Sequence, residues 1–136
     1  VVVSKEIKDS SKSEIKDINF VSDDDLILDI GPKTSDVYEE TIKKSSTLIW
    51  NGPVGVFEID QFSSGTEGIA QSISQSGGYS IAGGGDTVSA IEKFGVTDGI
   101  SYISTGGGAF LEFICDKTLP SVEALKNHIK NCEKGP

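Results

Sequence analysis

The sequence has no Met, one His and two Cys among its 136 residues. Cys115 and Cys132 lie 17 positions apart without a CxxC pair, and His128 is the only imidazole, so neither a zinc site nor a disulfide framework is predicted. No apolar run approaches the roughly 20 residues of a membrane span, and the first residues lack the basic and apolar regions of a signal peptide. These absences favour a cytoplasmic protein with reduced thiols and no membrane partner.

Basic residues are also scarce. Twelve Lys and Arg residues face 21 Asp and Glu residues, and the formal net charge is −9. This charge argues against a nucleic-acid partner bound through its phosphate backbone, although a local site could still bind a small anion. With 36% hydrophobic and 24% charged residues, the composition is that of a globular protein, and the length fits one domain.

The N-terminal region suggests that the chain is a piece of a longer protein. It begins with three consecutive Val residues and not with Met, and such a run is typical of a strand buried on both faces. Residues 4–25 are polar and are predicted to form a loop. Asp23-Asp24-Asp25 lacks the alternating spacing of an EF-hand, so a solvated acidic turn is favoured over a cation site.

Apolar segments and amphipathic segments then alternate along the chain. Strands are predicted at residues 26–30, 47–50, 79–82 and 100–104, and helices at about 32–44, 65–76, 86–95 and 106–115. This order predicts an α/β fold with a three-layer, Rossmann-like parallel sheet and helices on both faces, incomplete at its N-terminal side.

The helical segments carry apolar stripes that are predicted to face the core. These stripes comprise Ile69 with Ile73, Val88 with Ile91, Ala90 with Phe94, and Phe110 with Phe113 and Ile114. In the first helix, Glu39 with Lys43 and Glu40 with Lys44 form i,i+4 pairs on a solvated face. A last helix is predicted from Pro120, with Val122, Leu125 and Ile129 on one face, before a frayed polar tail at residues 131–136.

Glycine is concentrated in the connections between strands and helices. Fourteen of the sixteen Gly residues lie between Gly52 and Gly108. Ligands of open parallel sheets bind outside the carboxyl ends of the strands, so four strand-to-helix loops are predicted to converge into a site. These loops are residues 31–34, 51–58, 83–87 and 105–108.

Gly83-Gly84-Gly85 directly follows a predicted strand and opens a helix. Without Cβ atoms, its backbone N–H groups can approach an anion at a helix N-terminus, which suits a phosphate group. The alternative is a tight turn in which Asp86 only caps the helix. A second such turn, Gly106-Gly107-Gly108 after the next strand, favours the phosphate interpretation.

Asp86 would repel a phosphate group unless a cation lies between them, and Mg²⁺ bound by one carboxylate and phosphate oxygens meets this need. Neither a Walker motif nor GxGxxG occurs, so a P-loop NTPase and a standard dinucleotide fold are both disfavoured, and a nucleotide would have to be bound differently. In the loop 51–58, Asn51 can bind a phosphate, Pro53 and Val56 can face a base or sugar, and Glu58 can accept from ribose hydroxyls. Taken alone, this loop could equally be a conformationally demanding turn.

Read together, these motifs resemble the C-terminal part of phosphoglycerate kinase. The resemblance rests on DIGPKT at 29–34, WNGPVGVFE at 50–58, GGGDT at 83–87 and STGGGA at 104–109, in that order. It extends over residues 1–125, and it implies the C-terminal nucleotide-binding lobe of a two-lobed enzyme. Residues 126–136 are interpreted as a polar C-terminal tail.

The resemblance implies a phosphotransferase of glycolysis that moves a phosphoryl group reversibly from 1,3-bisphosphoglycerate to ADP, giving 3-phosphoglycerate and ATP. It assigns phosphate binding to Asn51, pocket contacts to Pro53 and Val56, and the ribose to Glu58. Residues Gly83, Gly84, Gly85 and Thr87 would hold nucleotide phosphates, and Asp86 would bind Mg²⁺. The amides of Gly106, Gly107 and Gly108 would face the transferring group in catalysis.

In the family, the basic patch for phosphoglycerate, the catalytic Arg and the lysines of the nucleotide site precede the segment that corresponds to residue 1. The resemblance therefore implies an enzyme that is monomeric when complete and a piece that is inactive without its N-terminal lobe. The alternative hypothesis is an isolated nucleotide-binding module without turnover.

Overall fold

The computed structural model describes residues 1–115 and 118–133. A parallel three-stranded sheet lies at its centre, with the strands in the order β4-β5-β6. Strand β4 spans Thr47–Trp50, β5 spans Tyr79–Gly83 and β6 spans Tyr102–Ser104. The predicted α/β class with an incomplete parallel sheet is confirmed, and the sheet is small.

A second, antiparallel sheet precedes the parallel one and was not predicted. Strand β1 (Val2–Ser4) lies between β2 (Glu14–Ile15) and β3 (Leu26–Asp29). The residues from 4 to 25 therefore do not form only a loop, and they also include the 3₁₀ turn η1 (Ile18–Phe20). Strand β2 has only two residues, which are too few for an alternating pattern in the sequence to predict it.

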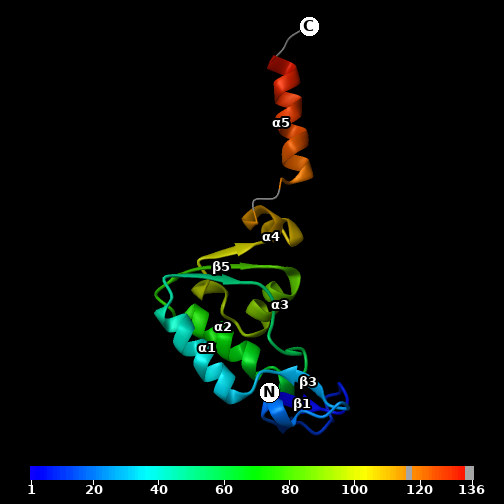
Figure 1. The fold of residues 1–136 in the computed structure, drawn as a ribbon. Helices are drawn as coiled ribbons and strands as arrows, with labels where there is room; N and C mark the ends of the chain where they lie inside the picture. Colours follow the sequence, from blue (N-terminus) through cyan, green and yellow to red (C-terminus); the bar gives the residue numbers. More distant parts are fainter. Residues whose placement is uncertain (116–117, 134–136) are drawn as a thin grey trace.

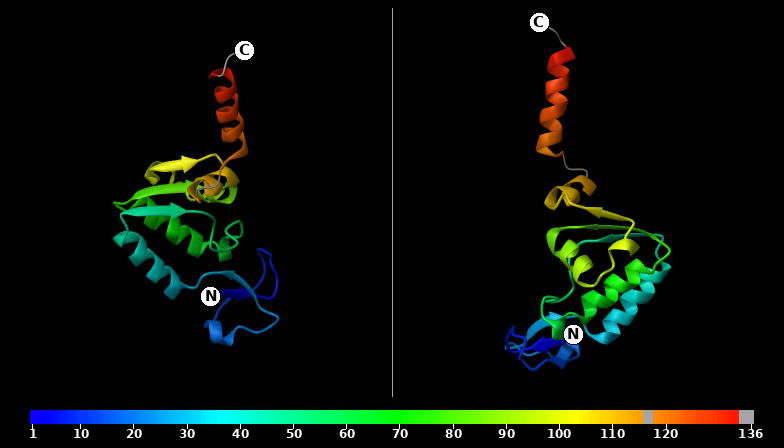
Figure 2. Two further views of the ribbon diagram at one scale, coloured as in Figure 1. Left: turned by 45° about the horizontal axis from the view of Figure 1, so that its top comes forward. Right: turned by 180° about the vertical axis from the view of Figure 1, so that it is seen from behind.

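The helices lie close to their predicted positions. They are α1 (Pro32–Lys44), α2 (Ser64–Ser74), α3 (Gly85–Lys93), α4 (Gly108–Ile114) and α5 (Pro120–Glu133). Two further 3₁₀ turns are η2 (Asp60–Phe62) and η3 (Thr97–Gly99). Figures 1 and 2 show α1 and α2 side by side against the parallel sheet, the antiparallel sheet at one end of the molecule and α5 at the other.

Helix α1 has the bounds that its sequence predicts. Pro32 occupies its first turn, where the missing N–H has no intrahelical acceptor in any case. The predicted pairs form, with 3.8 Å between Lys43 and Glu39 and 3.0 Å between Lys44 and Glu40. The two lysines also lie in the last turn, where positive charge is favourable.

The core lies between one face of the parallel sheet and the helices. Trp50 pairs with Ala82 and Ala82 with Ile103, so these side chains share a face by the twofold alternation of strands. The buried cluster on this face consists of Ile42, Trp50, Phe57, Ile69, Ala70, Ile73, Ala82, Ala90, Ile91, Val96 and Ile100. The predicted stripes of α2 and α3 are thus core, with Val88 and Phe94 only partly buried.

The opposite face of the parallel sheet is largely open, and the predicted core stripe of α4 is wrong. Ile49 is 54% exposed on this face, and Phe113 of α4 is 70% exposed. Phe110 packs against Gly83, which brings α4 to this face near the carboxyl end of β5. A pocket of about 400 Å³ lies between α4 and this face of the sheet. Over the described residues, α4 is the second helical layer, and it is too short to cover the sheet.

Helix α5 extends away from the sheets (Figures 1 and 2). Its predicted apolar face is exposed at Val122, Leu125 and Ile129. Helix α5 continues to Glu133, past the predicted start of the tail at residue 131, and the division between residues 125 and 126 falls inside this helix. Residues 134–136 of the predicted tail lie outside the described residues. Within those residues, no helix is both long and apolar enough to span a membrane.

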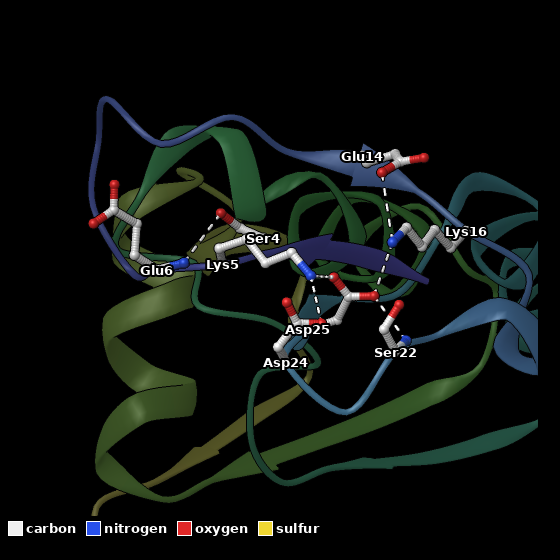
Figure 3. A network of polar contacts seen from close by, with 8 residues as sticks. All are labelled: Ser4, Lys5, Glu6, Glu14, Lys16, Ser22, Asp24 and Asp25. Carbon is white, nitrogen blue, oxygen red and sulfur yellow. Dashed lines mark hydrogen bonds and ion pairs between the residues drawn. The ribbon is translucent and has the colours of Figure 1, made fainter.

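The acidic turn at 23–25 is not a solvated turn throughout. Figure 3 shows the Asp25 carboxylate between two ammonium groups, with Lys5 and Lys16 each at 2.8 Å. Asp25 also accepts from the backbone N–H of Ser22, and its side chain is only 1% exposed. These contacts, first among them the hydrogen bond from Lys16, hold the pKa of Asp25 well below its ordinary value. Asp24 is the exposed member and pairs with Lys5.

Candidate functional site

The first glycine turn closes strand β5 and opens α3. Gly83 is the last residue of the strand, and Gly84 precedes the helix with φ +97°, a conformation that L side chains rarely adopt. No side chain caps this N-terminus. The first N–H groups of α3 have no intrahelical acceptor, so the exposed helix start at Gly85 and Asp86 can donate to an anion.

The predicted loop 51–58 meets this turn. A Cβ placed at Gly84 would lie 3.2 Å from Oδ1 of Asn51, so the Asn51 amide lies beside the helix start. Thr87 joins the two segments, because its buried hydroxyl accepts the N–H of Gly52 at 2.7 Å. The Thr87 hydroxyl is therefore engaged by the backbone of the loop 51–58.

The backbone of the loop 51–58 is fixed along most of its length. The indole N–H of Trp50 donates to the Gly52 carbonyl at 2.9 Å. The N–H of Val54 donates to the Thr66 hydroxyl at 3.2 Å, and the N–H of Val56 donates to the Leu28 carbonyl at 2.8 Å. The loop is therefore a preorganised segment.

Its side chains are distributed as a ligand site requires. Asn51 and Glu58 are exposed at the two ends of the loop, and Pro53 and Val56 are partly buried between them. The polar side chains are thus available to a ligand, while the apolar ones are anchored in the fold.

Asp29 is a buried carboxylate that contacts this loop at Gly55, and it is not among the site residues predicted from the sequence. It is 2% exposed and accepts the N–H of Gly65 at 2.7 Å and of Ile30 at 2.9 Å. Burial raises its pKa, opposed by these two hydrogen bonds. A Cβ at Gly55 or Gly65 would collide with it. The feature of the sequence that could have indicated its role is the position of this single acidic residue at the end of the apolar segment 26–30, just before Gly31-Pro32.

The second glycine turn follows the neighbouring strand. Gly83 pairs with Ser104, so the two turns start from adjacent strand ends. Helix α4 begins at Gly108 rather than at residue 106, and Gly107 precedes it with φ +54°. The N–H of Gly106 donates to the Ser104 hydroxyl at 3.2 Å, which engages one of the three predicted amides.

Comparison with known proteins agrees with this arrangement. The family model described as phosphoglycerate kinase matches residues 1–117. This chain belongs to the phosphoglycerate kinase family. The phosphoglycerate kinase structure from Coxiella burnetii is 47% identical with a TM-score of 0.86, covering 90% of this chain and 32% of that one. The structure from Pyrococcus horikoshii OT3 is 42% identical with a TM-score of 0.68, covering 75% and 25%. The chain therefore spans about a third or less of these phosphoglycerate kinases.

One of the four loops predicted to converge does not belong to the carboxyl edge of the parallel sheet. Residues 31–34 follow β3, which is a strand of the antiparallel sheet. They line a separate pocket of about 410 Å³ that also involves Val1 and Lys16. The prediction failed because an apolar strand carries no mark of the sheet that it joins. The other three loops follow β4, β5 and β6 as predicted.

The donor set at the start of α3 fits Mg²⁺ better than a metal bound by protein alone. Asp86 is exposed in the first turn of α3. No group of three or more His, Cys, Asp or Glu residues in the described part of the chain could hold a metal. A single carboxylate beside free helix amides matches a cation that takes its remaining ligands from phosphate oxygens and water.

Proposed function

We propose that this chain provides the Mg-nucleotide site of a phosphoglycerate kinase, a phosphotransferase that catalyses reversible phosphoryl transfer between 1,3-bisphosphoglycerate and ADP in glycolysis, giving 3-phosphoglycerate and ATP. The observation that carries the proposal is the uncapped start of α3, with Gly84 at positive φ, Asp86 exposed and Asn51 alongside. The family membership supports the reaction class.

The proposed roles follow from where each residue lies. The amides of Gly84, Gly85 and Asp86 donate to the nucleotide phosphates, and the Asn51 side chain donates beside them. The Asp86 carboxylate holds Mg²⁺, which neutralises phosphate charge when bound. Pro53 and Val56 contact the base or sugar, and Glu58 accepts from the ribose. Thr87 acts by fixing Gly52 in place.

The second glycine turn completes the proposed site. The turn at residues 105–108 begins beside the first one, since Ser104 pairs with Gly83. We propose that the amides of Gly107 and Gly108 face the transferring phosphoryl group, with Gly106 shaping the turn. Phosphoryl transfer depends mainly on positioning and on neutralising charge, so donors at adjacent strand ends are well placed for it.

The remainder of the enzyme must supply the other half of the reaction. All twelve basic residues of this chain are Lys, so it offers no guanidinium group to the transferring phosphate. We propose that the acyl phosphate substrate and the catalytic Arg lie on the N-terminal lobe of the complete, monomeric, cytoplasmic enzyme. The chain by itself then binds nucleotide without turnover, as the alternative hypothesis states. A coupled assay of ATP formation should show no activity above background.

Calorimetric titration of ADP with and without Mg²⁺ tests the site. Asp86→Asn should weaken ADP binding about tenfold in Mg²⁺, because the carboxylate ligand is lost, and should leave Mg²⁺-free binding unchanged or tighter. Asp98→Asn, an exposed carboxylate beyond the other end of α3, is the matched control. An equal loss without Mg²⁺ would exclude the metal role. A folded chain that binds no ADP at all would refute the nucleotide site.

A further inference from the structure

Lys93 lies in the last turn of α3 and reaches back to the far end of the loop 51–58. Its ammonium group donates to the Phe57 carbonyl at 2.7 Å, across 36 positions of the chain, and contacts the Asp60 carboxylate at 2.9 Å. A longer contact of 3.5 Å joins it to the carbonyl of Glu58. An ammonium has three donors, and these three acceptors engage them, so Lys93 has none left for a ligand.

The opposite end of the same helix holds the beginning of the same loop. Thr87, in the first turn of α3, accepts the N–H of Gly52 at 2.7 Å. Thr87 and Lys93 are six residues apart, which is about 9 Å along a helix. The loop is therefore attached to α3 near both of its ends.

We infer that α3 fixes both ends of the loop 51–58 and that Lys93 is a positioning residue for Glu58, the proposed ribose ligand. This inference rests on the proposed function and gives the two ends of α3 separate roles in it. The start of α3 binds phosphate groups, and Lys93 sets where the ribose carboxylate stands relative to them. A displacement of about 1 Å at such a residue can cost much of the binding or rate that depends on it.

The aromatic rings of Phe57 and Phe94 pack next to the contact between Lys93 and the loop 51–58. Phe57 is 4% exposed, and its ring lies 6.4 Å from that of Phe94, the residue after Lys93. The Lys93 ammonium lies 5.9 Å from the Phe94 ring. A positive charge is also favourable at a helix C-terminus, so the ammonium is held at this position by the helix as well as by the loop. The Phe57 carbonyl thus meets a donor that is already in place.

The test compares two ligands, ADP and inorganic tripolyphosphate, because only ADP has a ribose. Lys93→Met removes the ammonium and keeps the aliphatic stem. It should weaken ADP binding about tenfold, as for a lost charged hydrogen bond, and leave tripolyphosphate binding within about twofold of the wild type. Lys93→Arg should restore ADP binding. Asp60→Asn, which removes the exposed ion-pair partner only, should change neither affinity by more than about twofold.

Hydrogen exchange in the ligand-free chain separates positioning from general stability. The N–H groups of Phe57 and Ile59 are bonded within the loop, to Gly55 and Val56, and should exchange faster in Lys93→Met than in the wild type. Equal weakening of both ligands, no weakening of ADP, or unchanged exchange at these amides would overturn the inference. A wild-type chain that binds neither ligand would instead refute the proposed function.

Discussion

The backbone conformation of Gly84 sets how the chain turns from β5 into α3. Its φ of +97° lies in a region where a Cβ is strained, and the Asn51 amide oxygen stands 3.2 Å from the Cβ position. Gly85 next to it has ordinary φ and open space around it. Only Gly84 of these two neighbours has a backbone conformation that favours glycine, although the sequence shows the same residue at both positions.

Gly84→Ala should therefore destabilise the chain by about 1–2 kcal/mol and weaken ADP binding, because the turn must relax away from Asn51. Gly85→Ala is the matched control and should fold with at least wild-type stability, since Ala favours the helix that begins there. Thermal unfolding and ADP titration measure both effects. Equal melting temperatures for the two variants would show that the positive φ at Gly84 carries no strain.

Ion pairs join the segments around the three short strands of the antiparallel sheet. Asp25, before β3, joins Lys5 after β1 and Lys16 after β2 (Figure 3). These ion pairs raise the pKa of both lysines and lower that of Asp25. The same sheet supplies the Leu28 carbonyl to the N–H of Val56, so its integrity affects the loop 51–58.

The pH dependence of this sheet follows from the sign of the shifts. The pKa of Asp25 is lowered in the folded chain. The contribution of the Asp25 carboxylate to folding stability is therefore complete above the ordinary pKa of 3.8 and is lost as the pH falls below that value. The pKa values of Lys5 and Lys16 are raised, so the contribution of these lysines to folding stability is complete below their ordinary value of 10.5 and is lost as the pH rises above it. Asp25→Asn should lower the melting temperature at pH 7, with a smaller difference near pH 2. Asp24→Asn, at an exposed carboxylate, should have a smaller effect at pH 7.

The parallel sheet leaves most of one face without cover among the described residues. Strand β4 is one of the two edge strands, with β6 at the other edge. Its sequence TLIW has neither charge nor Pro, the devices that protect natural edges. Ile49, Tyr79 and Tyr102 are each more than half exposed on the same face. The chain covers 32% of the Coxiella structure, and we propose that the remainder of the enzyme covers this surface.

The chain on its own should therefore self-associate through β4. Ile49→Lys places a charge on that edge strand and should shift the sedimentation profile toward monomer, whereas Val37→Lys, at a site 61% exposed on α1, should not. The dependence of the sedimentation coefficient on protein concentration measures the effect. A wild-type chain that stays monomeric over the concentration range would refute the open edge as an association surface.

Local patterns determined much of this protein from the sequence alone. The bounds of α1 and β4, the glycine turns and the alternation of strand and helix depend on neighbours within a few residues, such as Pro32 and the Glu–Lys pairs of α1. The motif order also identified the family. These features are legible because propensity and capping act over short distances along the chain.

Tertiary structure alone decided which sheet each strand joined and which residues met. β3 reads like a strand of the parallel sheet but pairs with β1, and the apolar residues of α4 read as core but remain exposed. Thr87 with Gly52, and Lys93 with Phe57, come together over about 35 positions, as does buried Asp29 with Gly65. Such contacts depend on how the elements pack, and a local pattern contains no information about its partner far along the chain.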